Sequence, residues 1–317
     1  MTTPAHLASN PFQDLSGVDT SAFSNPYDAL IEASNDDPKE LQKRYDTHRT
    51  TRNAQQKEKL LSPDFSGVII DPILFRLQNP ETEPGFVDPR HCLVFWARPT
   101  EAVRCLISQI QLRLLDAAPN LWLMHSTSLH MTVLEITHSK TSSEIASLKP
   151  SLSPIIPSIV NITAQNPEKR ARLVKPLIGY DASALALSFV PAATGNEEDG
   201  YSYHHLRRDV YALASEKVKI ESRYVVPSAH LTIGRFLDSS DFAPEGEGDG
   251  IDVSRMAKLV EVIEDINAWL MQEYWPKEDG SIKEGGEWRV GEGKGLDCRA
   301  GTLWYGGGES IMVGEGF

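Results

Sequence analysis

Two stretches of the sequence share one pattern: SLHMTV at residues 128–133 and SAHLTI at residues 228–233. In a β-strand, successive side chains point to opposite faces, so Ser, His and Thr at alternate positions share one face and apolar residues occupy the other. Each stretch therefore predicts a strand with one buried face and one reactive face. Two such strands side by side would line a groove with two imidazoles and two threonine hydroxyls, a set that can hold a phosphate and move two protons.

The His-x-Thr spacing by itself is weak evidence, because it also occurs at residues 48–50 and 125–127. The first of these lies in a polar stretch that predicts a helix. In the second, His125 would point to the opposite face from His130 if the strand were continuous. Only the repeated stretches combine Ser two positions before His with alternating apolar residues. The sequence therefore singles out His130 and His230.

Composition and charge indicate an ordinary soluble protein. The chain has 317 residues, of which 40% are hydrophobic, and this is enough for one large domain or two smaller ones. A net charge of −13 argues against a footprint on long DNA or RNA, which requires clustered Lys and Arg. The charge is compatible with a small nucleotide or an RNA end. We therefore expect no long nucleic acid among the partners.

Three further features bear on location. The three cysteines lack Cys-x-x-Cys spacing, which indicates reduced thiols. Residues 1–17 have neither the basic nor the apolar region of a secretory signal. Apolar runs stay well short of the roughly 20 residues that a membrane-spanning helix needs. We expect a cytoplasmic protein, with the nucleus as the alternative, and no membrane association.

Residues 1–80 are interpreted as an N-terminal extension with one helix. Residues 1–37 are rich in Ser, Asn, Asp, Pro and Thr, and we expect them to be partly flexible. Residues 38–61 are mostly helix formers. Since this helix is mostly polar, we interpret it as a surface helix that packs on the body of the protein and has no other role. Residues 81–317 form the predicted domain.

The order strand, helix, His-bearing strand occurs twice in that domain. The first cycle comprises a strand at residues 91–97, an amphipathic helix at 100–118 and the strand with His130, and the second comprises strands at 173–180 and 184–190, a helix at 203–219 and the strand with His230. The two histidines lie 100 positions apart (230 minus 130). This order indicates two related halves.

Two further elements are predicted after the second cycle. Residues 253–273 predict a helix whose buried face carries Met256, Leu259, Val260, Ile263, Ile266 and Leu270. A hairpin is predicted near the C-terminus, with arms at residues 288–290 and 298–305. The glycine run at residues 306–308 ends the second arm.

The strand at residues 91–97, the two His-x-Thr motifs and the Gly-Arg pair at 234–235 together resemble the two-histidine (2H) phosphoesterase superfamily, which includes the 2′-5′ RNA ligase-like proteins and the 2′,3′-cyclic nucleotide phosphodiesterases. The resemblance covers residues 89–236 and extends to the C-terminal hairpin. It implies an α+β, bilobal fold of two antiparallel-sheet lobes flanked by helices, with a central cleft that holds both motifs. The N-terminal extension and the helix added after His230 depart from the family and leave the size of the substrate open.

The resemblance also implies a site. His130 and His230 become the catalytic pair, and Thr132 and Thr232 the phosphate ligands, of a phosphodiesterase that hydrolyses 2′,3′-cyclic phosphates of nucleotides or RNA ends. Histidine suits both proton removal and proton delivery, because a pKa of about 6.5 lets one imidazole be neutral while the other is protonated. The scheme predicts a bell-shaped pH profile and needs no metal or cofactor. It leaves open which histidine is the base.

Other residues could contact the substrate. Arg235 could supply a cation, and four aromatic residues could offer a stacking surface for a base: Trp96, Tyr201, Tyr203 and Tyr305. Ordinary packing is the alternative for the aromatics, and a solvated charge for Arg235. Ser128 and Ser228 are interpreted as strand residues that orient the neighbouring imidazole. His204 and His205 point about 100° apart on a helix and lack partners at ligand spacing, so we interpret them as surface or cleft-edge residues.

Two alternative functions stay open. One is an RNA-processing nuclease that trims 3′ ends with the same two histidines, which the acidic composition disfavours. The other is a non-catalytic nucleotide- or RNA-binding module, which the two intact motifs disfavour. A serine hydrolase and an ATP-driven ligase are also disfavoured, because neither a G-x-S-x-G elbow nor a P-loop occurs.

Overall fold

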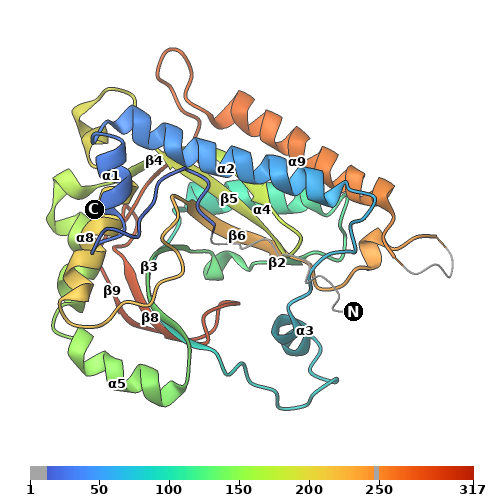
Figure 1. Ribbon diagram of the computed structural model, residues 1–317, viewed down its shortest axis with the longest axis horizontal. Coiled ribbons are helices and arrows are strands. Elements are labelled where there is room, and N and C mark those ends of the chain that lie inside the picture. Colours follow the sequence, from blue (N-terminus) through green and yellow to red (C-terminus); the bar gives the residue numbers. More distant parts are fainter. Residues whose placement is uncertain (1–12, 246–249) are drawn as a thin grey trace.

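Two antiparallel sheets form the framework of the computed structural model, which describes residues 13–245 and 250–317 (Figure 1). The four-stranded sheet has the order β3-β1-β8-β9 and the five-stranded sheet the order β2-β6-β5-β4-β7. The strands are β1 (His91–Ala97), β2 (Trp122–Leu123), β3 (Met131–Lys140), β4 (Arg172–Tyr180), β5 (Ala184–Pro191), β6 (Ala229–Arg235), β7 (Glu287–Arg289), β8 (Asp297–Gly301) and β9 (Glu309–Val313). This arrangement confirms the predicted α+β fold with two antiparallel-sheet lobes.

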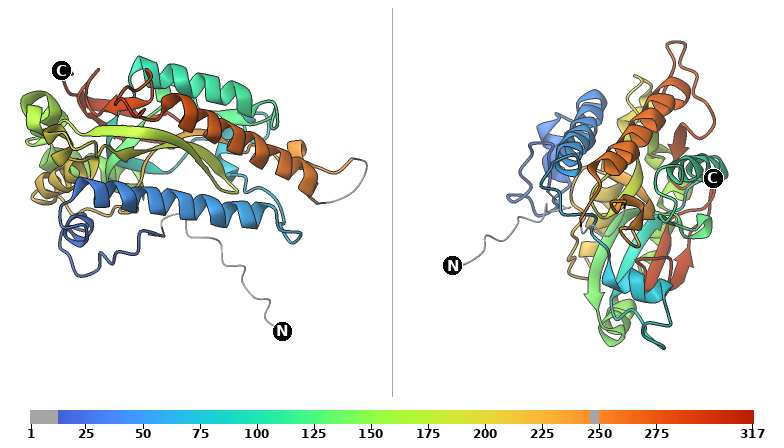
Figure 2. Two further views of the ribbon diagram at one scale, coloured as in Figure 1. Left: turned by 90° about the horizontal axis from the view of Figure 1, so that it is seen from above. Right: turned by 90° about the vertical axis from the view of Figure 1, so that its right-hand side faces the viewer.

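Helices pack on both sheets, as predicted. They are α1 (Asp28–Ala33), α2 (Pro38–Leu60), α3 (Pro72–Gln78), α4 (Glu101–Leu114), α5 (Ser142–Leu152), α6 (Ile156–Val160), α7 (Ile162–Gln165), α8 (Tyr203–Ser215) and α9 (Val253–Tyr274). The two long helices lie along the five-stranded sheet, where α2 contacts β5 and β4 and α9 contacts β4 (Figure 2). On the four-stranded sheet, α5 contacts β1 and β8, and α8 contacts β3.

The most regular sequence patterns predicted their elements closely. β1 coincides with the strand predicted at residues 91–97. α4 begins after Thr100, whose side chain accepts a hydrogen bond from the Val103 amide and so caps the helix. α9 buries all six residues of its predicted apolar face. In each of these elements, burial repeats with the period of the local backbone, which is the property that a sequence pattern reports.

The predicted C-terminal hairpin is wrong. β7 pairs with β4 in the five-stranded sheet, where Trp288 lies opposite Leu173, whereas β8 pairs with β1 and β9 in the four-stranded sheet. A strand-like pattern indicates that a segment is extended but does not name its partner. After β7 the chain turns at Gly291, whose φ of +89° favours glycine, and reaches the other sheet. The hairpin partner of β8 is β9, which follows the glycine run.

Between residues 13 and 80 the structure holds three helices where the sequence predicted one. The predicted helix is α2, whose N-cap Asp37 accepts a hydrogen bond from the Lys39 amide. α1 and α3 span six and seven residues, which is too short for a clear periodic pattern. The flexibility predicted for residues 1–12 lies outside the described residues, and the division of the chain at residue 80 stays a prediction.

One buried arginine connects the segments around the two motifs. Arg207 of α8 is 1% exposed, and its guanidinium donates to the Val133 carbonyl of β3 at 3.1 Å. It also donates to the carbonyls of Val226 (2.8 Å) and Tyr224, which lie in the segment that leads into β6. A fourth bond reaches the Tyr27 hydroxyl at 2.9 Å. Since β3 is an edge strand, its outward carbonyls need partners from outside the sheet, and Arg207 supplies one.

We predict that Arg207→Lys destabilises the protein by about 3 kcal/mol, because one ammonium group cannot reproduce the fork of donors and leaves buried carbonyls unpaired. The matched control is Arg208→Lys on the same helix, where the side chain is 32% exposed and bonds to Asp209. We expect that change to cost about 0.5 kcal/mol or less. Urea unfolding measures both variants. Equal midpoints for Arg207→Lys and the unmodified protein would contradict the structural role of Arg207.

Candidate functional site

The two repeated stretches meet where the two sheets contact one another. His130 directly precedes β3, which contains Thr132, and β3 contacts β6, which contains His230 and Thr232. Two cavities open there. The His130 compartment, of about 60 Å³, is lined by His130 and Thr132, and the His230 compartment, of about 230 Å³, is lined by His230. Tyr224, Thr232, Arg235 and Trp304 line both compartments, which therefore form one groove.

His130 is held in one plane and one tautomer. Its Nδ1 lies 2.8 Å from the carbonyl oxygen of Ser128. Because a carbonyl only accepts hydrogen bonds, Nδ1 carries the proton of the neutral ring and Nε2 keeps its lone pair. The Trp96 ring stacks on the imidazole, with centroids 3.6 Å apart and planes 14° apart. Trp96 is opposite Thr132 in the β1–β3 register, so the pairing of these strands positions the stack.

His230 has a different hydrogen-bond partner from His130, although the two histidines have similar neighbours in the sequence. Its Nδ1 lies 2.9 Å from the hydroxyl oxygen of Ser228, a group that can donate or accept. Both serines thus contact the imidazole two residues on, Ser128 through its backbone and Ser228 through its side chain. The prediction that both serines are strand residues is wrong. Ser128 is the last residue of a 3₁₀ turn, and β6 begins directly after Ser228. Both segments bend at this point before they enter their sheets.

Both imidazoles have a lowered pKa. Burial lowers the pKa of His130 to about 3, and the positive charge of Arg98 adds to this effect. Burial also lowers the pKa of His230 to about 4, and Arg52 and Arg207 add to the effect. Both side chains are therefore neutral at pH 7 in the ligand-free protein. The sequence did not indicate these lowered pKa values, because neighbouring cations and low solvent exposure are not visible in it.

Arg235, at the end of β6, is the cation that lines both compartments. Among the described residues it has no ion-pair partner, and its buried Nε has no hydrogen-bond acceptor. The hydroxyls of Thr132 and Thr232 likewise have no hydrogen-bond partner in the described part of the chain. One guanidinium and two hydroxyls thus converge on the groove between the histidines. This is a set of donors suited to a phosphate.

The structure places the predicted aromatic contacts in different settings. Trp96 lines the His130 compartment, but the imidazole covers one face of its ring. Tyr203 is fully buried and donates to the Thr132 carbonyl at 2.8 Å, so it positions β3. The ring of Tyr305 lies 5.7 Å from the Arg235 guanidinium. In the described chain, neither compartment is lined by Tyr201, Tyr203 or Tyr305.

The interpretation of His204 and His205 as surface or cleft-edge residues is wrong. The two residues are 2% and 4% exposed. His204 lies between the Tyr45 hydroxyl (2.8 Å) and the Tyr27 carbonyl (3.0 Å), and His205 pairs with Asp36 at 2.7 Å. Segments from the N-terminal 80 residues cover this part of α8, which local sequence could not indicate.

Sequence reasoning missed the groove residues that lie outside the motifs. Tyr224 and Trp304 line both compartments, and no local pattern marked them. α2 contributes His48 and Arg52 to the His230 compartment. His48, Arg52 and Gln56 recur at four-residue steps on the inner face of α2, and this spacing of polar residues was the available signal.

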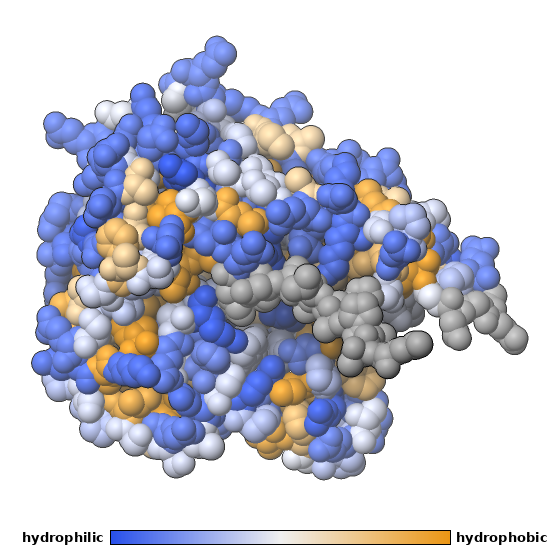
Figure 3. All heavy atoms as spheres, in the orientation of Figure 1, coloured by the Kyte–Doolittle hydropathy of each residue, from blue (hydrophilic) through white to orange (hydrophobic). Residues whose placement is uncertain are grey.

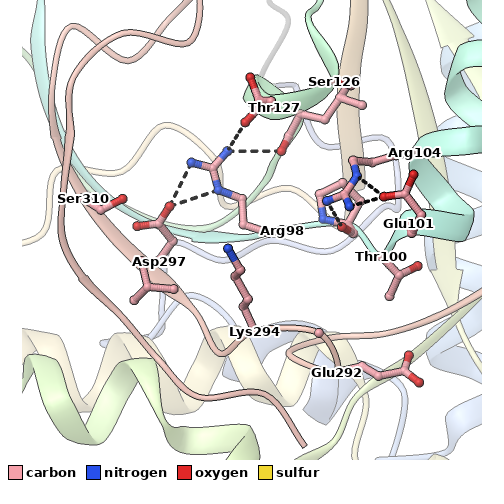
Figure 4. Close-up of a pocket in the computed structure, with 14 residues that line it drawn as sticks. Arg98, Thr100, Glu101, Arg104, Ser126, Thr127, Glu292, Lys294, Asp297 and Ser310 are labelled. Carbon is pink, nitrogen blue, oxygen red and sulfur yellow. Dashed lines mark hydrogen bonds and ion pairs between the residues drawn. The ribbon is translucent and has the colours of Figure 1, made fainter.

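A larger cavity of about 460 Å³ is lined by residues that include Arg98, Arg104 and Lys294 and by neither motif histidine (Figure 4). Its cations are largely neutralised, because Arg98 pairs with Asp297 at 2.8 Å and Arg104 pairs with Glu101. The Arg98 guanidinium also lies 4.8 Å over the Trp96 ring. Arg98 therefore contacts the ring on which His130 stacks.

Residues 13–245 and 250–317 contain no group of three His, Cys, Asp or Glu side chains arranged to hold a metal ion. No helix formed by these residues is long and apolar enough to cross a bilayer. Cys92, Cys105 and Cys298 are free thiols. The face shown in Figure 3 is mostly hydrophilic, with hydrophobic residues scattered over it.

Comparison with known proteins adds little to this description. No family model and no curated protein sequence matches the chain. Among solved structures, Usb1 from Kluyveromyces marxianus, determined with uridine monophosphate, aligns with 71% of this chain and 96% of its own length, at 12% sequence identity and a TM-score of 0.35. A likeness this distant says nothing about the function of this chain.

Proposed function

We propose that this protein is a phosphodiesterase that opens 2′,3′-cyclic phosphates of nucleotides or RNA ends without a metal ion. The observation that carries the proposal is the groove itself, which is lined by His130, His230 and Arg235 and by two threonine hydroxyls that have no hydrogen-bond partner in the described part of the chain. Two proton-transfer groups around one anion site are what hydrolysis of a phosphodiester requires.

His130 is proposed as the general base. In its neutral form Nδ1–H donates to the Ser128 carbonyl, which leaves the Nε2 lone pair available for a water proton. The resulting hydroxide-like oxygen forms the new bond to phosphorus.

His230 is proposed as the general acid. As the bond from phosphorus to the departing ribose oxygen breaks, His230 gives that oxygen its proton, and water has replaced the ribose oxygen at phosphorus. The Ser228 hydroxyl can accept from Nδ1–H both before and after this transfer, because the proton that leaves is carried by Nε2. Thr132, Thr232 and Arg235 would bind the non-bridging oxygens as negative charge develops.

The same groove could serve the two alternatives. A nuclease that trims RNA 3′ ends would use the same histidines, and turnover that rises with chain length would distinguish it. A binding module would retain the donors of Arg235 and the threonines without turnover. The His230 side of the groove is about 230 Å³, which leaves room beyond a phosphate for part of a nucleoside.

We predict that His130→Ala and His230→Ala each lower kcat/KM for 2′,3′-cyclic nucleoside monophosphates by about 10² to 10⁴. The two should differ on a 3′-(p-nitrophenyl) nucleotide ester, whose leaving group needs no proton. There the defect of His230→Ala should shrink, and that of His130→Ala should persist. Reactions contain excess EDTA, and products are separated by chromatography.

His125→Ala is the control for this experiment, because His125 is exposed and does not line the groove. It should retain full activity. Turnover that survives both motif substitutions would contradict the two-histidine mechanism, and equal defects of both variants on the activated ester would contradict the assignment of base and acid.

The lowered pKa values also predict the pH dependence. The free protein must hold one proton on the pair, so above pH 5 the competent form becomes rarer, and kcat/KM should fall about tenfold per pH unit between pH 5.5 and 8. A bound phosphate raises both pKa values, so kcat itself should peak nearer neutrality. The free energy of unfolding has the opposite pH dependence. Below about pH 6.5 the unfolded chain binds protons at these histidines that the folded chain does not, so the free energy of unfolding falls as the pH falls.

Initial rates across this range, each with a circular dichroism check of folding, measure the profile. A value of kcat/KM that is flat or rises from pH 5.5 to 8 would show that the lowered pKa values do not govern catalysis.

A further inference from the structure

One wall of the His230 compartment comes from α2, which lies outside the region that resembles the phosphoesterase family. Two successive turns of α2 are bonded to β4: Arg49 donates to the Lys175 carbonyl at 2.7 Å, and the Asn53 side-chain amide donates to the Ile178 carbonyl at 2.8 Å. Arg49 and Asn53 line the compartment together with Arg52. α2 is therefore a rigid part of the groove and not just a surface helix.

Arg52 is the residue of α2 whose charge reaches the site. Its side chain is 20% exposed and pairs with Asp181 at 2.7 Å. Asp181 lies in the turn between β4 and β5, where its other oxygen accepts from the amides of Ser183 (2.8 Å) and Ala184 (3.0 Å). The turn thus fixes the carboxylate, and the carboxylate fixes the guanidinium. Arg52 and His230 line the same compartment, and the charge of Arg52 adds to the effect of burial in lowering the pKa of His230.

The groove presents arginine side chains at several places. Arg235 lies where the two compartments meet, whereas Arg52 and Arg49 line only the His230 compartment, and Arg49 pairs with Asp46 of the same helix. Arg223 lines the His130 compartment, where it pairs with Glu135. His48, also in this wall, does not add a charge at neutral pH, because burial lowers its pKa to about 4. Small side chains, including Ala184 and Ala186, form the adjacent part of the wall. Space and a second cation thus lie on one side of the proposed reaction centre.

We propose that Arg52 binds a second phosphate of the substrate, the 5′-phosphate of the nucleoside whose 3′ side carries the phosphate held between the histidines. This inference rests on the proposed function, which defines the 3′ phosphate. It makes the preferred substrate an RNA 3′-terminal nucleotide and not a free cyclic mononucleotide. A net charge of −13 limits favourable contacts with further phosphates, so the preference should end after this one.

Isothermal titration of adenosine 3′-monophosphate and adenosine 3′,5′-bisphosphate at one ionic strength tests the inference without requiring turnover. The second phosphate should lower Kd about tenfold in the unmodified protein, as one charge-assisted contact does. Arg52→Gln should reduce this ratio of Kd values to about one or two. Asp181→Asn keeps an oxygen for the turn but removes the competing carboxylate charge, so it should raise the ratio.

Lys43→Gln is the matched control on the same helix, because Lys43 is 70% exposed and lies outside the compartment. It should leave the ratio unchanged, and thermal melts check that every variant is folded. The inference would be overturned by a ratio of Kd values near one in the unmodified protein, or by a ratio that is lowered in both Arg52→Gln and Asp181→Asn. Arg52 would then have only a structural role, as the ion-pair partner of Asp181. Failure of both nucleotides to bind would overturn the proposed function itself.

Discussion

The site depends on one buried guanidinium. Arg207 is almost completely removed from water and, within the described chain, has no carboxylate partner, so its charge is compensated by backbone carbonyls and by the Tyr27 hydroxyl and ring. Such a charge is tolerated only when its donors are well satisfied. The acceptors come from β3, from the segment before β6 and from the N-terminal part of the chain. Their relative positions are therefore coupled, and with them the distance between the two motifs.

The two motifs are alike in sequence and unlike in structure, and the proposed chemistry uses the difference. A backbone carbonyl can only accept, so it holds the neutral His130 in a single tautomer, whereas the Ser228 hydroxyl can accept or donate and allows His230 either tautomer. Trp96 packs on His130 and Tyr224 lies near His230, with ring centroids 5.9 Å apart. A duplicated pattern thus yields an asymmetric pair, which is what separate acid and base roles require.

Local sequence predicted those parts of the molecule whose burial follows the local backbone period. β1, α4, α9 and both His-x-Thr motifs belong to this class, because each alternates or repeats within its own segment. The C-terminal hairpin failed because strand pairing is a property of two segments, and β7 joined β4 across the chain. α2 was misjudged for a related reason: its inner face carries His48 and Arg52, so hydropathy described a solvated helix where the fold places a wall of the groove. The lowered pKa values, too, arise from residues far apart in the sequence.

The most direct test of the central claim is a crystal structure with an adenosine–vanadate complex, whose five-coordinate vanadium imitates phosphorus at the transition state. We predict that vanadate binds between His130 and His230, so that one apical oxygen faces Nε2 of each histidine. The equatorial oxygens should be bound by Thr132, Thr232 and Arg235. Vanadate bound elsewhere, or in contact with only one of the two histidines, would contradict this prediction.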